Sequence, residues 1–188
     1  MIYWFQNLPP KSLYDDVWKP VIMYKWLRKS FMAAVYILQF VLLIVFMIYV
    51  KNYIPNILNS VPVVIRISIP RSAIYISLIA MLVVHEILHI AVIFSKGDFS
   101  ITFRHLFFWI NTDAELSKFR YFIFICLPLF ILSVIPFIIS LFFYNNLTYV
   151  LRIIAFFNLI ISSADVINAV FILPKPNKAI FCRGMYRI

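Results

Sequence analysis

Four apolar segments, each long enough to cross a lipid bilayer, constrain the fold of this chain more than any other feature. They are Phe31–Val50, Ser72–Phe94, Tyr121–Tyr144 and Tyr149–Leu173. Hydrophobic residues make up 64% of the 188 positions and charged residues 13%, whereas a soluble domain has about 45–50% apolar and about 25% charged residues. The sequence therefore predicts an all-α integral membrane protein with four transmembrane helices.

The basic residues between these segments predict the orientation of the chain. Thirteen Lys and Arg residues lie before the first span, between the second and third, or after the fourth, and four lie on the opposite side. Cytoplasmic loops carry such an excess, so we expect a multi-pass protein of the cell membrane with both termini in the cytoplasm. The expected parts are a cytoplasmic or interfacial segment (1–30), a membrane domain with the metal site (31–173) and a cytoplasmic tail (174–188).

The net charge of +10 is spread between the spans. It forms no isolated basic stripe that could follow a nucleic-acid backbone, so membrane lipid is the expected partner and nucleic acid is not. The two cysteines, Cys126 and Cys182, exclude a zinc site built from four thiolates. The sequence leaves the oligomeric state open.

Two polar connections show the alternation of apolar and polar residues that is typical of half-buried strands. They are Val61–Ile69 and Phe99–Arg104. The second follows the second span closely and predicts a short strand or hairpin lying against the membrane. An exposed edge at Phe99–Phe103 could then bind an extended substrate by strand addition. A surface loop with scattered aromatic residues is the alternative.

The second span carries the sequence His85-Glu86-Ile87-Leu88-His89, which is the His-Glu-x-x-His pattern of zinc metalloproteases. On a helix the two histidines lie on one face and can bind one metal ion. The adjacent glutamate can take a proton from a metal-bound water. A pair of core histidines satisfied by hydrogen bonds is the alternative, although polar groups at membrane depth are usually functional.

The third expected ligand is Asp165. Glu86 and Asp165 are the two carboxylates within the four spans, and no Lys or Arg lies deep in any span. A divalent cation on His85 and His89 would balance both charges, and protonation of the acids is the alternative. The expected topology also places Asp165 at the depth of the two histidines. We therefore expect one Zn²⁺ per chain on His85, His89 and Asp165, with an open position for water.

Asn158 lies two helical turns before Asp165, with Ser162 between them on the same face. Its amide could hold a substrate carbonyl or stabilise the oxyanion of the transition state. Hydrogen bonding between helices is an equally weighted alternative. Four residues after the second span compete with Asp165 as third ligand if their connection folds back into the membrane: His105, Asp98, Asp113 and Glu115.

The chain resembles a bacterial family of small membrane proteins described as putative zincin peptidases. The likeness covers Leu78 to the C-terminus and rests on three stretches: Val84–His89, Ala114–Lys118 before a proline-containing span, and Asn158–Asp165 followed by Val166. The arrangement is also similar to that of the site-2 proteases. These resemblances imply that His85, His89 and Asp165 are ligands, that Glu86 is the base and that Asn158 positions the substrate.

The favoured function is intramembrane proteolysis dependent on zinc, in which Glu86 activates a zinc-bound water to hydrolyse peptide bonds of membrane-embedded or membrane-proximal substrates. The first alternative is a metal-binding membrane protein without proteolytic activity, such as a partner-binding or protective factor. A metal transporter is disfavoured, since one three-ligand site provides no second site or charged path.

Overall fold

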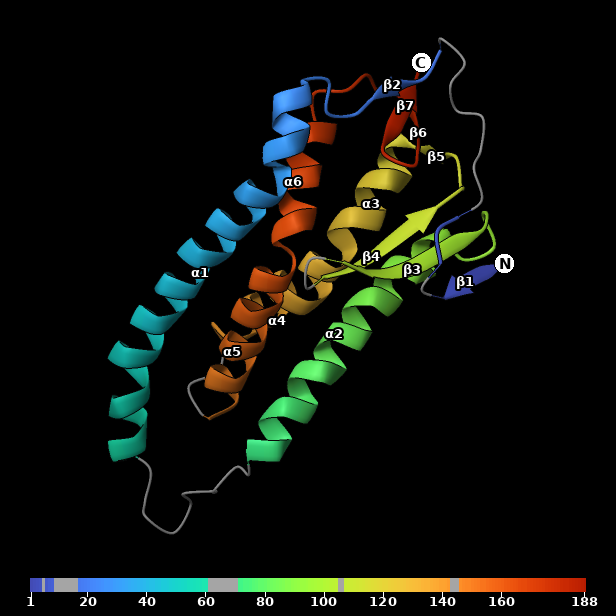
Figure 1. The fold of residues 1–188 in the computed structure, drawn as a ribbon. Helices are drawn as coiled ribbons and strands as arrows, with labels where there is room; N and C mark the ends of the chain where they lie inside the picture. Colours follow the sequence, from blue (N-terminus) through green and yellow to red (C-terminus); the bar gives the residue numbers. More distant parts are fainter. Residues whose placement is uncertain (5, 9–16, 61–70, 105–106, 143–145) are drawn as a thin grey trace.

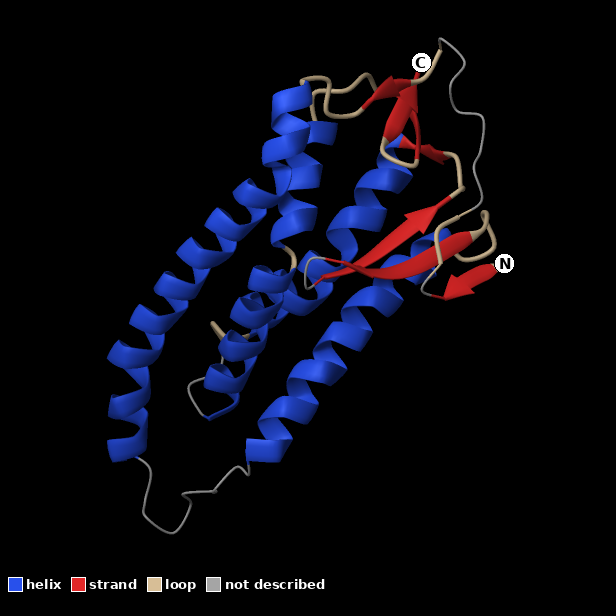
Figure 2. Ribbon diagram, viewed as in Figure 1, coloured by secondary structure: helices blue, strands red, loops and turns tan. Residues whose placement is uncertain are grey.

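The computed structural model describes residues 1–4, 6–8, 17–60, 71–104, 107–142 and 146–188. The strand expected over Val61–Ile69 lies outside this part of the chain. Figure 1 traces the chain, and Figure 2 shows that helices dominate it and that strands gather near one end of the helices. The helices are α1 (Lys25–Ser60), α2 (Arg71–Ile93), α3 (Lys118–Leu129), α4 (Ile135–Ile139), α5 (Asn146–Ile161) and α6 (Ser163–Ile172). The strands are β1 (Ile2–Trp4), β2 (Lys19–Pro20), β3 (Phe99–Arg104), β4 (Phe107–Thr112), β5 (Leu116–Ser117), β6 (Ile180–Cys182) and β7 (Met185–Arg187).

Two of the described helical segments, Lys25–Asn52 and Lys118–Ile139, are long and apolar enough to cross a membrane. A third span is present if Val150–Ile161 and Ser163–Ile172, which meet at a bend of 60°, are counted together. In α2 the described apolar stretch is the shorter Ile79–Ile93. These lengths are compatible with a membrane protein of two or three spans. The expectation of an all-α chain holds only in part, because the described residues also form two sheets.

The helices pack around α3 and the bent pair α5–α6. Helix α2 lies against α3, α3 lies against α6, and α1 contacts both α5 and α6. In Figure 1, α5 and α6 run between α1 and α2. Large apolar side chains along the outer face of α1 stay exposed, among them Phe40 and Met47. Apolar exposure of this extent on a long helix is expected for a surface that faces lipid.

The third span contains a turn of π-helix, Phe130–Val134, between its two prolines. The backbone N–H of Ile135 donates to the carbonyl of Phe130, five residues earlier. Pro128 lies just before this turn and Pro136 just after it. Proline removes a backbone donor, and π-turns inside α-helices are frequent at functional sites. The carbonyl of Pro128 and the hydroxyl of Ser133, in the π-turn, both contact the polar centre described below.

The first sheet has the strand order β1-β3-β4, with β1 parallel and β4 antiparallel to β3. The hairpin expected after the second span is therefore present as β3 and β4. The expected exposed edge at Phe99–Phe103 is wrong for Phe99–Ile101, where β1 and β4 pair with β3 on its two sides. In the order β1-β3-β4, strand β4 is an edge strand, because β3 is its one neighbour among the described strands of this sheet. Gly97 makes the entry to β3 possible, since a Cβ there would lie 2.8 Å from the backbone N of Ala114.

The second sheet has the order β2-β7-β6-β5 and is antiparallel. A two-residue turn, Arg183-Gly184, joins β6 to β7 with positive φ angles of 46° and 73°, as two-residue hairpins require. The main buried core joins residues of both sheets with residues of α2, α3 and α6, and it contains Ile93, Phe99, Phe124 and Phe181. Both sheets and the core lie close to the polar centre.

Candidate metal centre

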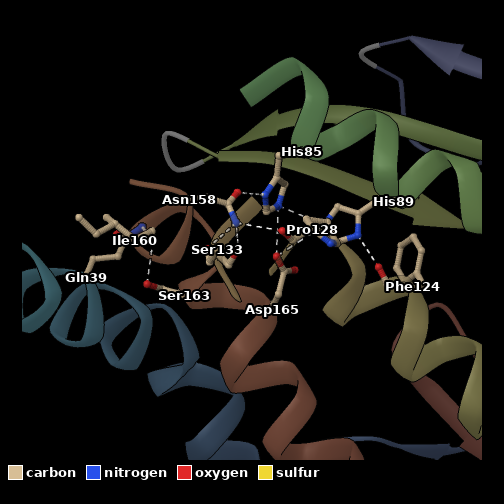
Figure 3. A network of polar contacts seen from close by, with 11 residues as sticks. Gln39, His85, His89, Phe124, Pro128, Ser133, Asn158, Ile160, Ser163 and Asp165 are labelled. Carbon is tan, nitrogen blue, oxygen red and sulfur yellow. Dashed lines mark hydrogen bonds and ion pairs between the residues drawn. The ribbon is translucent and has the colours of Figure 1, made fainter. Parts of the chain in front are cut away.

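Helix α2 presents His85 and His89 on one face, as their spacing of four residues requires. Both side chains are buried, with exposed fractions of 3% and 6%. Their Nε2 atoms lie 3.2 Å apart. Asp165 of α6 completes a triangle, with Oδ2 at 3.2 Å from Nε2 of His85 and 3.5 Å from Nε2 of His89. Figure 3 shows the carboxylate of Asp165 facing the two rings.

The second ring nitrogen of His85 determines its tautomer. Nδ1 lies 2.9 Å from Oδ1 of Asn158. The other end of this amide, Nδ2, donates to the carbonyl of Pro128 at 3.0 Å and to Oγ of Ser133 at 2.8 Å. A carbonyl can only accept, so Nδ2 must face Pro128 and Oδ1 must face His85. His85 therefore donates from Nδ1, and Nε2 of the neutral ring carries a lone pair.

His89 is held in the same tautomer by a backbone carbonyl. Its Nδ1 lies 2.5 Å from the carbonyl oxygen of Phe124. Within an α-helix this oxygen would accept from the N–H four residues later, but that residue is Pro128, which has none. The proline thus leaves the carbonyl available to His89. As a result, Nε2 of His89 also presents a lone pair toward Asp165.

Three acceptor atoms therefore meet at one point: Nε2 of His85, Nε2 of His89 and Oδ2 of Asp165. When both imidazole rings are neutral, none of these atoms carries a proton that could be donated to the others. One proton could bridge one pair of these atoms, whereas one cation can contact all three. The separations of 3.2–3.5 Å exceed the 2.7–2.9 Å of a hydrogen bond between charged groups. They match the ~3.3–3.4 Å expected between ligand atoms that surround a zinc ion tetrahedrally at about 2.0–2.1 Å. The donor set therefore fits a single zinc ion.

Among the described residues, His85, His89 and Asp165 form the group of potential ligands whose atoms lie within 4.8 Å of one another. The described competitors for the third position make other contacts. Asp98 pairs with the amino group of Met1, Asp113 with Arg183, and Glu115 with Arg187. His105 lies outside the described residues.

Asp165 owes its position to the bend between α5 and α6. The bend exposes the carbonyl of Ile160, which accepts from Nε2 of Gln39 at 3.2 Å and from Oγ of Ser163 at 2.8 Å. Helix α6 then begins after Ser162 and carries Asp165 in its first turn, where the helix dipole favours a negative charge. Figure 3 shows Gln39 reaching this carbonyl from α1. The backbone at the bend is therefore fixed by contacts from another helix.

Asn158 is fully buried. In addition to His85, Pro128 and Ser133, its amide contacts Oγ of Ser162 at 3.3 Å. All of its polar atoms thus bind other groups of the protein, and its contacts differ from those expected of a residue that holds substrate. The geometry makes it a partner that orients His85, the kind of neighbour that metal-binding histidines usually have.

A cavity of about 710 Å³ opens beside the triangle, and Glu86 lines it together with both histidines and Asp165. The carboxylate of Glu86 forms no hydrogen bond or ion pair with any described residue. It is available to a molecule in the cavity. Strand β4 forms another wall through Phe108, Trp109, Ile110 and Asn111. The edge strand therefore runs along the same space as the candidate ligands.

Several residues that shape the centre give little signal in the sequence. Gln39 is the one amide in its apolar span, and that isolation is its only signal. Ser133 shares its span with Ser140, so it is not distinguished by isolation. The carbonyl of Phe124 is a backbone group, so its role could have been inferred only from Pro128 four positions later. Ser163 contributes to the bend through its hydroxyl.

The comparisons with known proteins agree with this chemistry. Residues 78–180 match the model of a family described as "Putative zincin peptidase". This segment covers more than half of the chain and includes both histidines, Glu86, Asn158 and Asp165. No curated protein and no solved structure matches the chain.

Proposed function

The chain belongs to the putative zincin peptidase family, and from that premise we propose that it is an intramembrane zinc metallopeptidase. It would hydrolyse peptide bonds of membrane-embedded or membrane-proximal polypeptides. One observation carries the proposal: two lone pairs of histidine nitrogens and one carboxylate oxygen converge beside a cavity that also contains Glu86. His85, His89 and Asp165 would hold one zinc ion per chain.

When bound, zinc supplies Lewis acidity for a water molecule and for the substrate carbonyl. The residues of the chain supply the rest of the chemistry. Glu86 takes a proton from the attacking water and later delivers it to the leaving amine nitrogen. Asn158 and the carbonyl of Phe124 hold the two imidazole rings in the tautomer with Nδ1–H. These two groups position the ligands and do not touch the substrate.

The open geometry favours hydrolysis over simple metal binding. A structural zinc site is usually closed by four protein ligands, whereas a catalytic site has three and leaves one position to water or substrate. Here three candidate ligands lie at the wall of a cavity of about 710 Å³. A carboxylate without a described partner, that of Glu86, lies beside them. A protein that only stores or senses a metal ion has no need of such a group.

The substrate would bind as an extended strand along β4. A transmembrane helix has its amides paired internally, so a segment must unwind before its peptide bonds can be reached. The edge of β4 offers backbone groups with which an unwound segment can pair. With both termini in the cytoplasm, as the basic residues predict, the two sheets would lie at the cytoplasmic end of the helices.

The test compares the parent with Glu86→Gln, using Glu115→Gln as the matched control. Glu115 is exposed and pairs with Arg187, so its substitution removes an equal charge away from the cavity. Zinc content is measured by elemental analysis, and cleavage by mass spectrometry of single-span reporters with a destabilised helix. We expect all three proteins to bind one zinc ion, and Glu86→Gln to lose about 10²–10⁴-fold in rate.

Two outcomes would contradict the proposal. Cleavage by Glu86→Gln at the parental rate would remove Glu86 from the mechanism. Stoichiometric zinc in the parent without cleavage of any reporter would favour the non-proteolytic metal-binding protein instead.

A further inference from the structure

A second cavity, of about 920 Å³, opens off the metal cavity. The two cavities share five lining residues, so they lie side by side. Two of these are asparagines from different elements: Asn111 on β4 and Asn168 on α6, three residues after Asp165. A chain leaving the metal centre along β4 would pass Asn111, which lines both cavities. The second cavity is therefore within reach of an extended substrate.

The lining of the junction suits a polypeptide backbone. The side-chain amides of Asn111 and Asn168 form no hydrogen bond with any described residue. Each amide can donate and accept, which is what the alternating N–H and C=O groups of a peptide require. Thr102, opposite Trp109 in the β3–β4 ladder, adds a hydroxyl to the wall of the second cavity. Neutral groups of this kind bind backbone without selecting side chains.

The charge of the second cavity is positive. Arg28 and Arg183 line it, and no described acidic residue does. The guanidinium of Arg183 is already paired with Asp113. Arg28, in the first turn of α1, is exposed and forms no side-chain hydrogen bond or ion pair with a described residue, and this turn contains no acidic residue. Arg28 is thus the cation available to a bound group.

We propose that the second cavity receives the part of the substrate polypeptide beyond the metal centre, and that Arg28 selects a carboxylate there. This inference rests on the proposed function, since it assigns a substrate preference to the same site. Guanidinium groups bind carboxylates in a planar, bidentate manner that lysine cannot reproduce. The shared wall with the metal cavity and the two asparagines on that wall favour a polypeptide over an anionic lipid as occupant.

The test measures binding and does not depend on cleavage. The protein is full-length, zinc-loaded Glu86→Gln in nanodiscs of zwitterionic lipid. The probes are fluorescent extended peptides in which a single Glu or Gln is moved along the sequence. At one or two adjacent positions, Glu should strengthen binding about tenfold over Gln, as expected for one charged hydrogen bond.

The variants assign this effect to Arg28. Arg28→Gln should abolish the preference for Glu, and Arg28→Glu should replace it with a preference for Lys at the same position. Lys29→Gln is the matched control, because Lys29 is the next residue on α1, is exposed and lines neither cavity. It should keep the preference.

Three results would overturn the inference: no difference between Glu and Gln peptides in the parent background, a difference that persists in Arg28→Gln, or loss of the difference when anionic lipid is added. The last result would assign the cavity to lipid headgroups. Different outcomes would refute the proposed peptidase function and the selection by Arg28. Absence of cleavage with carboxylate-dependent binding intact would refute the peptidase, whereas equal cleavage of Glu and Gln reporters would refute only the selection by Arg28.

Discussion

Oδ1 of Asn158 lies 2.9 Å from Nδ1 of His85, and this contact fixes which nitrogen of the imidazole is free to bind a metal ion. Asn158→Ala should leave the ring without its acceptor and lower zinc affinity about 10–100-fold, the usual effect of removing such a partner. Competition with a chromophoric chelator measures this affinity. Asn177→Ala, which removes an amide that accepts from Lys118 on the surface, should leave it unchanged. Unaltered zinc binding in Asn158→Ala would show that the tautomer is set in another way.

Pro128 should influence His89 through the carbonyl of Phe124, which it leaves without a helical N–H donor. Pro128→Ala would restore an N–H near the carbonyl of Phe124, which would then compete with Nδ1 of His89. Zinc affinity should fall about 2–10-fold, which corresponds to part of the free energy of one hydrogen bond. Thermal stability should stay the same or rise, because the helix regains a backbone donor. Pro136→Ala, beyond the π-turn, should leave zinc affinity unchanged. A parallel fall of stability and affinity in Pro128→Ala would point to general loosening of the helix.

Gln39 should influence the metal centre from a different helix. Gln39→Leu keeps the volume but removes one of the two donors to the carbonyl of Ile160. We expect a loss of about 1 kcal/mol in stability and a several-fold loss in zinc affinity, because the bend positions Asp165. Met47→Leu, at an exposed position of the same helix, serves as control in thermal unfolding with and without zinc. If Gln39→Leu and Met47→Leu had the same stability and zinc affinity, α1 would have no influence on the metal centre.

Removal of zinc should destabilise the parent. A free concentration near 100 times Kd contributes about 2.7 kcal/mol through mass action, so chelation should lower the thermal unfolding temperature. Asp165→Ala lacks one of the three ligand atoms and should show a much smaller response to chelation. If both proteins respond equally, the ion is bound elsewhere. Circular dichroism at 222 nm follows the transition.

Apolar length predicted four spans, of which the described helices support two, or three if the bent pair is counted as one. The hairpin after the second span could be predicted from its alternation of apolar and polar residues. The bend at Ser162 could not, because no proline or glycine marks it and its exposed carbonyl is satisfied by Gln39, more than a hundred residues away. The edge of the first sheet was assigned to the wrong strand for a similar reason. The pairing of β1 with β3 joins residues 2–4 to residues 99–101, and no local pattern reports such a contact.

The triangle of His85, His89 and Asp165 was predictable from the two acids within the apolar segments. An unpaired carboxylate inside a membrane is energetically unfavourable, so the two acids indicate a shared positive charge such as a metal ion. The contacts of Asn158 were not, since the sequence cannot tell which way an amide points. The role of Phe124 was also hidden, because its side chain takes no part in the hydrogen bond to His89.

The hydrogen bond from Gln39 to Ile160 crosses the boundary of the segment that matches the family, residues 78–180. Strands β2 and β7, which pair with each other, both lie outside that segment. An excised fragment limited to residues 78–180 would lose a donor at the bend and lack both of these strands. The first quarter of the polypeptide therefore contributes a contact that shapes the candidate metal centre, and dissecting the protein at the family boundary would discard it.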